Sequence, residues 1–189
     1  MQTWEEAHAW EKTWHLHNPL IYYEQMKQEV YLEKMGFDAE YPDYDLKRQR
    51  ILDIGGGDYS VLLRFTNFTG HVTDPLMDEF KSWVRQRYTD HGITFDSNKA
   101  EDLSLTGFDV VLFYNVLQHT QDPEKIVANA RKAGKVIRCF EWIEEPVSPG
   151  HIHTLHAKDL DTWLDGTGKV DMLNDRGCRG LAYYGIFNT

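Results

Sequence analysis

Short apolar runs that alternate with helical patterns, from residue 50 onward, constrain the fold of this chain most strongly. Strands are predicted at 50–54, 70–74, 93–96, 109–114 and 134–142, with helices at 59–67, 77–91 and 122–133. This alternation predicts a mostly parallel sheet whose two faces are both covered by helices. The sequence therefore indicates an α/β fold.

The C-terminal part of the chain extends this sheet. A helix is predicted at 157–165, and two further strands at 169–173 and 181–187. The residues between the two strands include NDRGCRG, which is rich in turn-forming residues. This composition favours an antiparallel hairpin at the edge of a seven-stranded sheet.

The first 45 residues have a helical pattern and differ from the rest of the chain. Trp4, Ala7, Trp10 and Trp14 recur at the spacing of one helical face. We divide the chain into a helical N-terminal cap, 1–45, and a main domain, 46–189. We interpret most of the tryptophans as packing against the sheet edge.

Two signals mark the ends of helices in the cap. Thr3 and Glu6 fit a capping box at the start of the first helix. A second helix is predicted from about Pro19 to Met35, with Gly36 as its C-terminal stop.

Composition excludes several classes of protein. The 189 residues carry a net charge of −10, which disfavours nucleic acid as a partner. No apolar run is long enough to cross a membrane, so we expect no membrane partner. Cys139 and Cys178 lack metal-ligand spacing, which indicates a reducing, cytoplasmic location and argues against a structural zinc site. We expect no metal, with a site of two histidines and Glu144 or Glu145 as the alternative.

A glycine-rich stretch follows the first predicted strand of the sheet. In RILDIGGGDYSVLL, residues 50–63, Asp53 is followed by Gly55, Gly56 and Gly57. A ligand bound at the carboxyl ends of parallel strands could approach the backbone here, although a ligand-free turn is the alternative. Ser60 stands where a dinucleotide fingerprint requires glycine, and no Walker sequence is present.

Three further motifs follow later strands. Asp74 ends the second strand, where a carboxylate can accept hydrogen bonds from a ribose diol or cap the next helix, as Asp78 could. KAEDL, residues 99–103, follows the third strand. The stretch FDVVLFYNVLQHTQDPEKI, residues 108–126, ends its strand at Tyr114 and Asn115 before Asp122-Pro123 opens a helix.

In their order along the chain, these motifs resemble the class I S-adenosylmethionine-dependent methyltransferases over roughly residues 48–189. The resemblance implies a Rossmann-like sheet of seven strands with the last one antiparallel. It also implies S-adenosyl-L-methionine as methyl donor, S-adenosyl-L-homocysteine as product, and a helical cap over the site.

The resemblance further implies roles for matching residues. The loop of Asp53, Gly55, Gly56 and Gly57 would hold the methionine part of the cofactor, and Asp74 the ribose. The adenine would lie against Ala100, Glu101 and Asp102, and the sulfonium beside Tyr114 and Asn115. The chain departs from the family at Tyr59, where a glycine is usual, and at Lys99, where Asp or Ser is usual.

Catalysis on a hydroxyl acceptor needs a base, and histidine is the commonest choice near neutral pH. His151 and His153 follow the fifth strand and are our candidates, with His156 nearby. Packing or solvent exposure is the alternative for these side chains. We interpret His119 as structural.

We expect O-methylation of a small molecule such as a sugar, with Tyr22 and Tyr23 beside the cofactor and acceptor. A nucleic-acid methyltransferase and a non-catalytic partner subunit are the alternatives. The sequence leaves the oligomeric state open.

Overall fold

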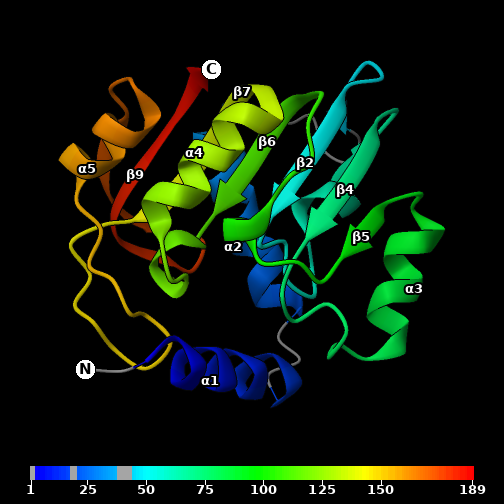
Figure 1. Ribbon diagram of the computed structural model, residues 1–189, viewed down its shortest axis with the longest axis horizontal. Helices are drawn as coiled ribbons and strands as arrows, with labels where there is room; N and C mark the ends of the chain where they lie inside the picture. The colour runs from blue at the N-terminus through cyan, green and yellow to red at the C-terminus, as the bar shows by residue number, and fades with distance from the viewer. Residues whose placement is uncertain (1–2, 18–20, 38–43) are drawn as a thin grey trace.

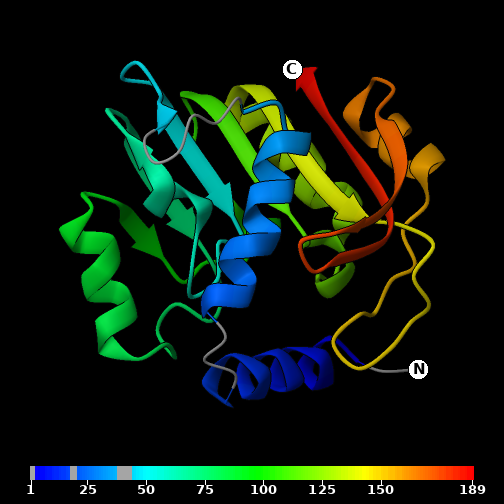
Figure 2. The same cartoon turned by 180° about the vertical axis from the view of Figure 1, so that it is seen from behind.

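A seven-stranded sheet forms the centre of the molecule (Figures 1 and 2). This computed structural model describes residues 3–17, 21–37 and 44–189, without the side chains of residues 16, 17, 21–24 and 44. The strand order is β5-β4-β2-β6-β7-β9-β8. The bounds are β2 Arg50–Ile54, β4 Thr69–Thr73, β5 Thr94–Asp96, β6 Phe108–Tyr114, β7 Gly134–Trp142, β8 Lys169–Asp175 and β9 Cys178–Asn188.

The direction of the strands confirms the predicted sheet. β9 runs antiparallel to both of its neighbours, β7 and β8, and the other pairings in this sheet are parallel. Arg176 and Gly177, with φ of 43° and 83°, form the two-residue turn between β8 and β9. Two residues with positive φ match the right-handed twist of a hairpin.

Helices cover both faces of the sheet (Figures 1 and 2). α2 (Ile21–Lys34) and α3 (Ser82–Asp90) pack on one face, where Met35 and Val84 join Ile51 in one core. α4 (Pro123–Ala133) and α5 (Ala157–Leu164) pack on the other face, where Ile126 and Leu160 join a second core. Successive strand residues point to opposite faces, so each central strand supplies both cores.

α1 (Trp4–His17) lies across the carboxyl ends of the strands, as Figures 1 and 2 both show. It starts at the predicted capping box, which the structure confirms. The Thr3 N–H donates to Glu6 Oε2 at 2.9 Å, and the Glu6 N–H donates to Thr3 Oγ1 at 3.2 Å. The helix therefore sits where the resemblance places a ligand.

The predicted helix at 59–67 is wrong. A short 3₁₀ turn, η1 (Val61–Arg64), is followed by strand β3 (Phe65–Thr66), which pairs with β1 (Tyr44–Asp45). The side chain of Ser60 accepts from the Leu62 N–H and starts the tight turn. Phe65 is fully buried, and an aromatic residue followed by a β-branched one favours extended backbone over helix.

The predicted helix at 77–91 is shorter in the structure and begins at Ser82. Turns occupy the residues before it, because Asp74 Oδ1 accepts from the Leu76 N–H at 2.8 Å. Arg85 then reaches back and donates to the carbonyl oxygens of Met77 and Phe80. These bonds satisfy backbone groups that a longer helix would have paired internally.

Candidate active site

The glycine loop after β2 is tightly packed. Gly55 has φ +71°, and a Cβ there would lie 2.6 Å from a methyl group of Val116. A Cβ on Gly56 would lie 2.8 Å from both Asp53 Oδ2 and Val72 Cγ1. Both positions therefore require glycine for the turn itself. For these two glycines, packing alone is a sufficient reason, whether or not a ligand binds.

Gly57 differs from its two neighbours. Its φ is +64°, and a Cβ there would meet only His15 Cε1, at 3.6 Å. The space beside Gly57 is open, and all three glycines line a cavity of about 470 Å³ at the carboxyl ends of the strands. The loop can therefore let a ligand approach its backbone.

Asp53 lies behind the loop and does not line the cavity. Its Oδ2 accepts hydrogen bonds from Ser60 Oγ and from the Tyr114 hydroxyl, the latter at 2.8 Å. Its Oδ1 is buried without a partner in the described residues, and burial raises the pKa of Asp53 to about 7. The side chain ties the loop to the end of β6.

Asp74 faces the same cavity from the end of β4. Its Oδ2 accepts from the Gly57 N–H at 2.9 Å, and its Oδ1 accepts from the Leu76 N–H. Burial raises the pKa of this carboxyl. Each oxygen keeps a further lone pair, so Asp74 can both fix the loop and accept hydrogen bonds from a ligand.

The loop after β5 forms another wall. Lys99, Ala100 and Glu101 line the cavity, with Ala100 starting η2 (Ala100–Asp102). Glu101 Oε1 accepts from the N–H groups of Gln121 and Asp122, at 2.9 and 3.3 Å. Asp102 does not line the cavity, so its predicted adenine contact lacks support from the geometry.

The end of β6 forms the floor. Tyr114 and Asn115 line the cavity, and Asn115 has φ +56°, which turns the chain sharply into η3 (Leu117–His119). Glu141, fully buried on β7, supports this turn from below. Its carboxylate accepts from the N–H groups of Val116 at 3.1 Å and Leu117 at 3.2 Å.

Burial raises the pKa of Glu141 to about 8, although its two backbone hydrogen bonds oppose this. An acid whose pKa rises on folding holds its proton more tightly when folded. Its contribution to stability is therefore complete below pH 4.5 and is lost as the pH rises to 8. The full shift corresponds to roughly 5 kcal/mol, so this group has a measurable effect.

We therefore expect the melting temperature of the wild type to fall more steeply between pH 5 and 8.5 than that of Glu141→Gln. The amide resembles the protonated acid and does not titrate. Glu144→Gln, an exposed neighbour, is the control and should follow the wild type. Parallel pH curves for the wild type and Glu141→Gln would contradict the expectation.

α1 forms the roof of the cavity. Trp4, His8, Glu11 and His15 line it together with Trp10 and Trp14, so our interpretation of the tryptophans as edge packing is wrong. The first four recur at spacings of four, three and four. They form a stripe next to the one that Ala7, Trp10 and Trp14 define. That stripe of polar and aromatic residues was the signal in the sequence.

Three ion pairs hold this roof to the body of the molecule. Lys12 Nζ lies 2.8 Å from Glu79, and His15 Nδ1 lies 3.3 Å from Asp58. Glu11 Oε1 lies 3.1 Å from His119 Nδ1, so His119 is a cavity residue rather than a purely structural one.

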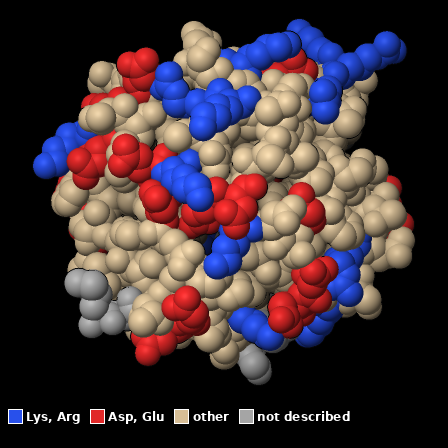
Figure 3. All heavy atoms as spheres, viewed as in Figure 1, with Lys and Arg blue, Asp and Glu red and all other residues tan. Residues whose placement is uncertain are grey.

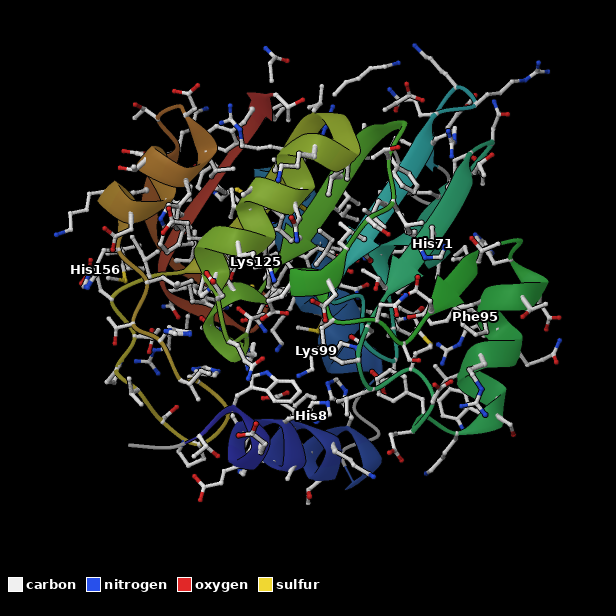
Figure 4. The ribbon with its side chains drawn as sticks, viewed as in Figure 1. His8, His71, Phe95, Lys99, Lys125 and His156 are labelled. Carbon is white, nitrogen blue, oxygen red and sulfur yellow. The ribbon has the colours of Figure 1, made fainter. Side chains whose placement is uncertain are left out.

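Aromatic and cationic groups connect the roof to the loop after β5. The rings of Trp4 and His8 stack at 4.6 Å, and Lys99 Nζ lies 3.6 Å from the centre of the Trp4 ring. Figure 4 shows His8 and Lys99 between α1 and the sheet. Cation–π attraction of this kind stabilises the closed roof.

The structure separates the two candidate bases. His151 lines the cavity, and its ring packs edge-to-face on His119 at 4.7 Å. Burial and the nearby His119 lower the pKa of His151 to about 4, against the opposing charge of Glu11. His151 is therefore neutral at pH 7, and none of the described side chains hydrogen-bonds its ring.

His153 and His156 form hydrogen bonds outside the cavity. The His153 Nε2–H donates to the Thr120 carbonyl at 2.8 Å, and His153 does not line the cavity. His156 stands at the N-cap of α5 and pairs with Glu144 at 2.9 Å. Both residues hold the segment between β7 and α5 in place.

The sequence analysis singled out three tyrosines near the site, and the structure describes the side chain of one of them. Tyr22 and Tyr23 lie in the first turn of α2, but their side chains lie outside the described residues, so their pocket role stays a prediction. Tyr59 accepts from Gln25 Nε2 at 2.6 Å, and its ring lies 4.7 Å from the Arg87 guanidinium. These contacts tie Tyr59 to α2 and α3.

No group of three side chains that could hold a metal ion occurs within the described ranges. None of the helices in those ranges has both the length and the hydrophobicity needed to cross a bilayer.

The comparisons agree with this geometry. Residues 52–136 match the family described as a methyltransferase domain, and this range runs from β2 to the start of β7. The match thus includes the glycine loop, Asp74, the loop after β5 and the end of β6. The match covers this central part of the chain, and the chain has the Rossmann-like fold of S-adenosylmethionine-dependent methyltransferases. No curated protein matches the chain.

Solved structures share the fold at low sequence identity. Magnesium protoporphyrin IX methyltransferase from Synechocystis, bound to S-adenosylhomocysteine, has a TM-score of 0.62 and 12% identity over 89% of this chain and 84% of its own. A methyltransferase from Aquifex aeolicus has a TM-score of 0.55 and 12% identity over 87% and 98%. Mitomycin 7-O-methyltransferase has a TM-score of 0.56 and 17% identity over 94% and 60%.

Proposed function

We propose that this methyltransferase transfers its methyl group to a hydroxyl of a small molecule. The observation that carries the proposal is the position of His151, which lines the same cavity as the glycine loop and Asp74. A volume of about 470 Å³ suits small-molecule ligands. The roof of α1 limits the size of the acceptor.

The described residues fit the cofactor. The open backbone at Gly57 suits its methionine part, and Asp74 its ribose. Ala100 and Glu101 would lie beside the adenine, and the β6 end at Asn115 beside the sulfonium. Asp53 acts indirectly, through the loop. When bound, the cofactor supplies a methyl group on a positively charged sulfur.

The residues of this chain position the acceptor and take its proton. The ring of His151 would take the proton of the acceptor hydroxyl as its oxygen accepts the methyl group. Glu11, which lies against His119, stabilises the positive charge that then forms on His151. The roof of α1 excludes water from the reacting groups.

The charges of the cavity disfavour a nucleic-acid acceptor. Five carboxylates line it, against three Lys and Arg side chains: Glu11, Asp58, Asp74, Glu101 and Glu145 against Lys27, Lys99 and Arg179. On the face in Figure 3, the largest group of Lys and Arg side chains lies at the upper edge, away from α1. A phosphate backbone would be repelled where the base must enter.

A labelled-methyl assay tests the proposal. The protein is incubated with methyl-labelled S-adenosylmethionine and with sugars, phenols, hydroxy acids, duplex DNA or RNA. We expect label in one class of hydroxylated small molecule and none in nucleic acid. Transfer to nucleic acid alone would overturn the proposal.

We also propose a cytoplasmic location, which the small number and the spacing of the cysteines, Cys139 and Cys178, support.

A further inference from the structure

One part of the cavity wall is built over a glycine of β9. A Cβ on Gly180, which has φ +143°, would lie 2.8 Å from Glu145 Oε1 and 3.3 Å from Trp142 Cε3. Both Glu145 and Trp142 line the cavity. The missing side chain at position 180 therefore lets a carboxylate and an indole sit together against the strand.

The carboxylate of Glu145 has no hydrogen bond or ion pair with any residue in the described part of the chain. Arg179, which precedes Gly180, also lines the cavity and likewise pairs with none of those residues. Glu145 is half-buried, so its negative charge is less well solvated than on an open surface. A positively charged ligand group would satisfy it.

The indole of Trp142 is fixed in place. Its ring packs edge-to-face on Phe140, with centroids 5.1 Å apart and planes at 87°. Trp142 is half-buried and leads directly from β7 toward Glu145. An aromatic face beside a carboxylate is an arrangement that attracts ammonium groups.

We infer that Glu145 and Trp142 bind a protonated amine on the acceptor, so that the substrates are hydroxylated amines such as amino alcohols or amino sugars. The inference rests on the proposed function and names the substrate class of the same site. An ammonium group has no lone pair, so the nitrogen held by Glu145 cannot take the methyl group. The hydroxyl remains the nucleophile, as proposed above.

The charge balance of the cavity agrees with a cationic acceptor. The five lining carboxylates outnumber the three Lys and Arg side chains, and Glu11 and Asp58 pair with His119 and His15, whereas Glu145 has no such pair among the described residues. Arg179 is exposed at the rim and carries the same charge sign as the amine. It should therefore weaken amine binding slightly rather than support it.

Calorimetry on the protein saturated with S-adenosylhomocysteine tests the inference. The probes are matched pairs, tyramine with N-acetyltyramine and glucosamine with N-acetylglucosamine. At pH 7 we expect the wild type to bind the amine of at least one pair about tenfold more tightly than its neutral partner. Glu145→Gln should remove this preference.

Two variants serve as controls. Glu144→Gln changes the adjacent carboxylate, which pairs with His156 and does not line the cavity, and it should keep the preference. Arg179→Ala should keep or slightly increase it. Equal binding of amine and neutral partner by the wild type, or the same result for Glu144→Gln and Glu145→Gln, would overturn the inference.

The two proposals fail in different ways. Methyl transfer to neutral hydroxylated molecules without any preference for amines would leave the proposed function intact and refute the amine subsite. A preference for amines that depends on Glu145, without methyl transfer to oxygen, would support the subsite and refute the proposed function.

Discussion

Replacing Asp74 with alanine is expected to weaken the binding of S-adenosylhomocysteine about 100-fold while the sheet stays folded. Each hydrogen bond to a charged group contributes about 1.5–3 kcal/mol, and a ribose diol can form two with this carboxylate. The substitution also releases the Gly57 N–H, which Asp74 holds at 2.9 Å. Both effects act on the same wall of the cavity.

Titration calorimetry measures this loss, with circular dichroism as the check on folding. Asp78→Ala is the matched control, because Asp78 is exposed, binds Ser97 Oγ and does not line the cavity. We expect its affinity to equal that of the wild type. If Asp74→Ala proves unstable, Asp74→Asn keeps one acceptor oxygen and gives the second measurement. Unchanged affinity in the Asp74 variants would show that the ribose does not bind there.

His151→Ala is expected to lower kcat about 100-fold and to leave the affinity for S-adenosylhomocysteine unchanged. Loss of a general base typically costs a factor of 10² or more. His151 has a pKa of about 4, so its neutral form predominates throughout pH 6–9. The loss should therefore be constant across that range, in a steady-state assay with the hydroxylated acceptor.

His153→Ala is the matched control for this measurement. Its ring donates to the Thr120 carbonyl outside the cavity, so we expect a small decrease in stability and little change in kcat. Equal losses of kcat in the two variants would argue for a structural role of the whole loop. A parallel loss of cofactor affinity in His151→Ala would exclude its assignment as the base.

The buried strands were the most predictable part of the fold. The ranges 50–54 and 134–142 coincide with β2 and β7. Their apolar residues pack against helices on both sides, so burial alone determines the pattern that the sequence displays. The order of the motifs then located the glycine loop, Asp74 and Asn115 on one cavity.

The segments whose secondary structure was predicted wrongly depend on tertiary contacts. The stretch 59–67 has enough apolar residues for a helix, but Phe65 is buried and its strand pairs with β1, a partner distant in sequence. The start of α3 depends on Arg85 reaching the carbonyls before it. Neither partner can be read from local composition.

The face of α1 toward the cavity was also missed. Helical periodicity reveals which residues share a face, but not what that face contacts. The tryptophans of α1 line the cavity, and so do His8 and Glu11, which lie outside the stripe that the tryptophans define. Likewise, no local signal distinguishes His151 from His153, because the difference depends on a loop that returns over the sheet.

The position of β9 has a consequence for the order of folding. β9 lies between β7 and β8, although it follows both in the chain. During synthesis, β8 therefore leaves the ribosome before β9, the strand with which it pairs. The edge of β7 stays unpaired until β9 is available. Until β9 is inserted, that edge is exposed to pairing with other chains. Gly180 lies in β9, so the wall that it forms with Trp142 and Glu145 is completed in this last step of sheet assembly.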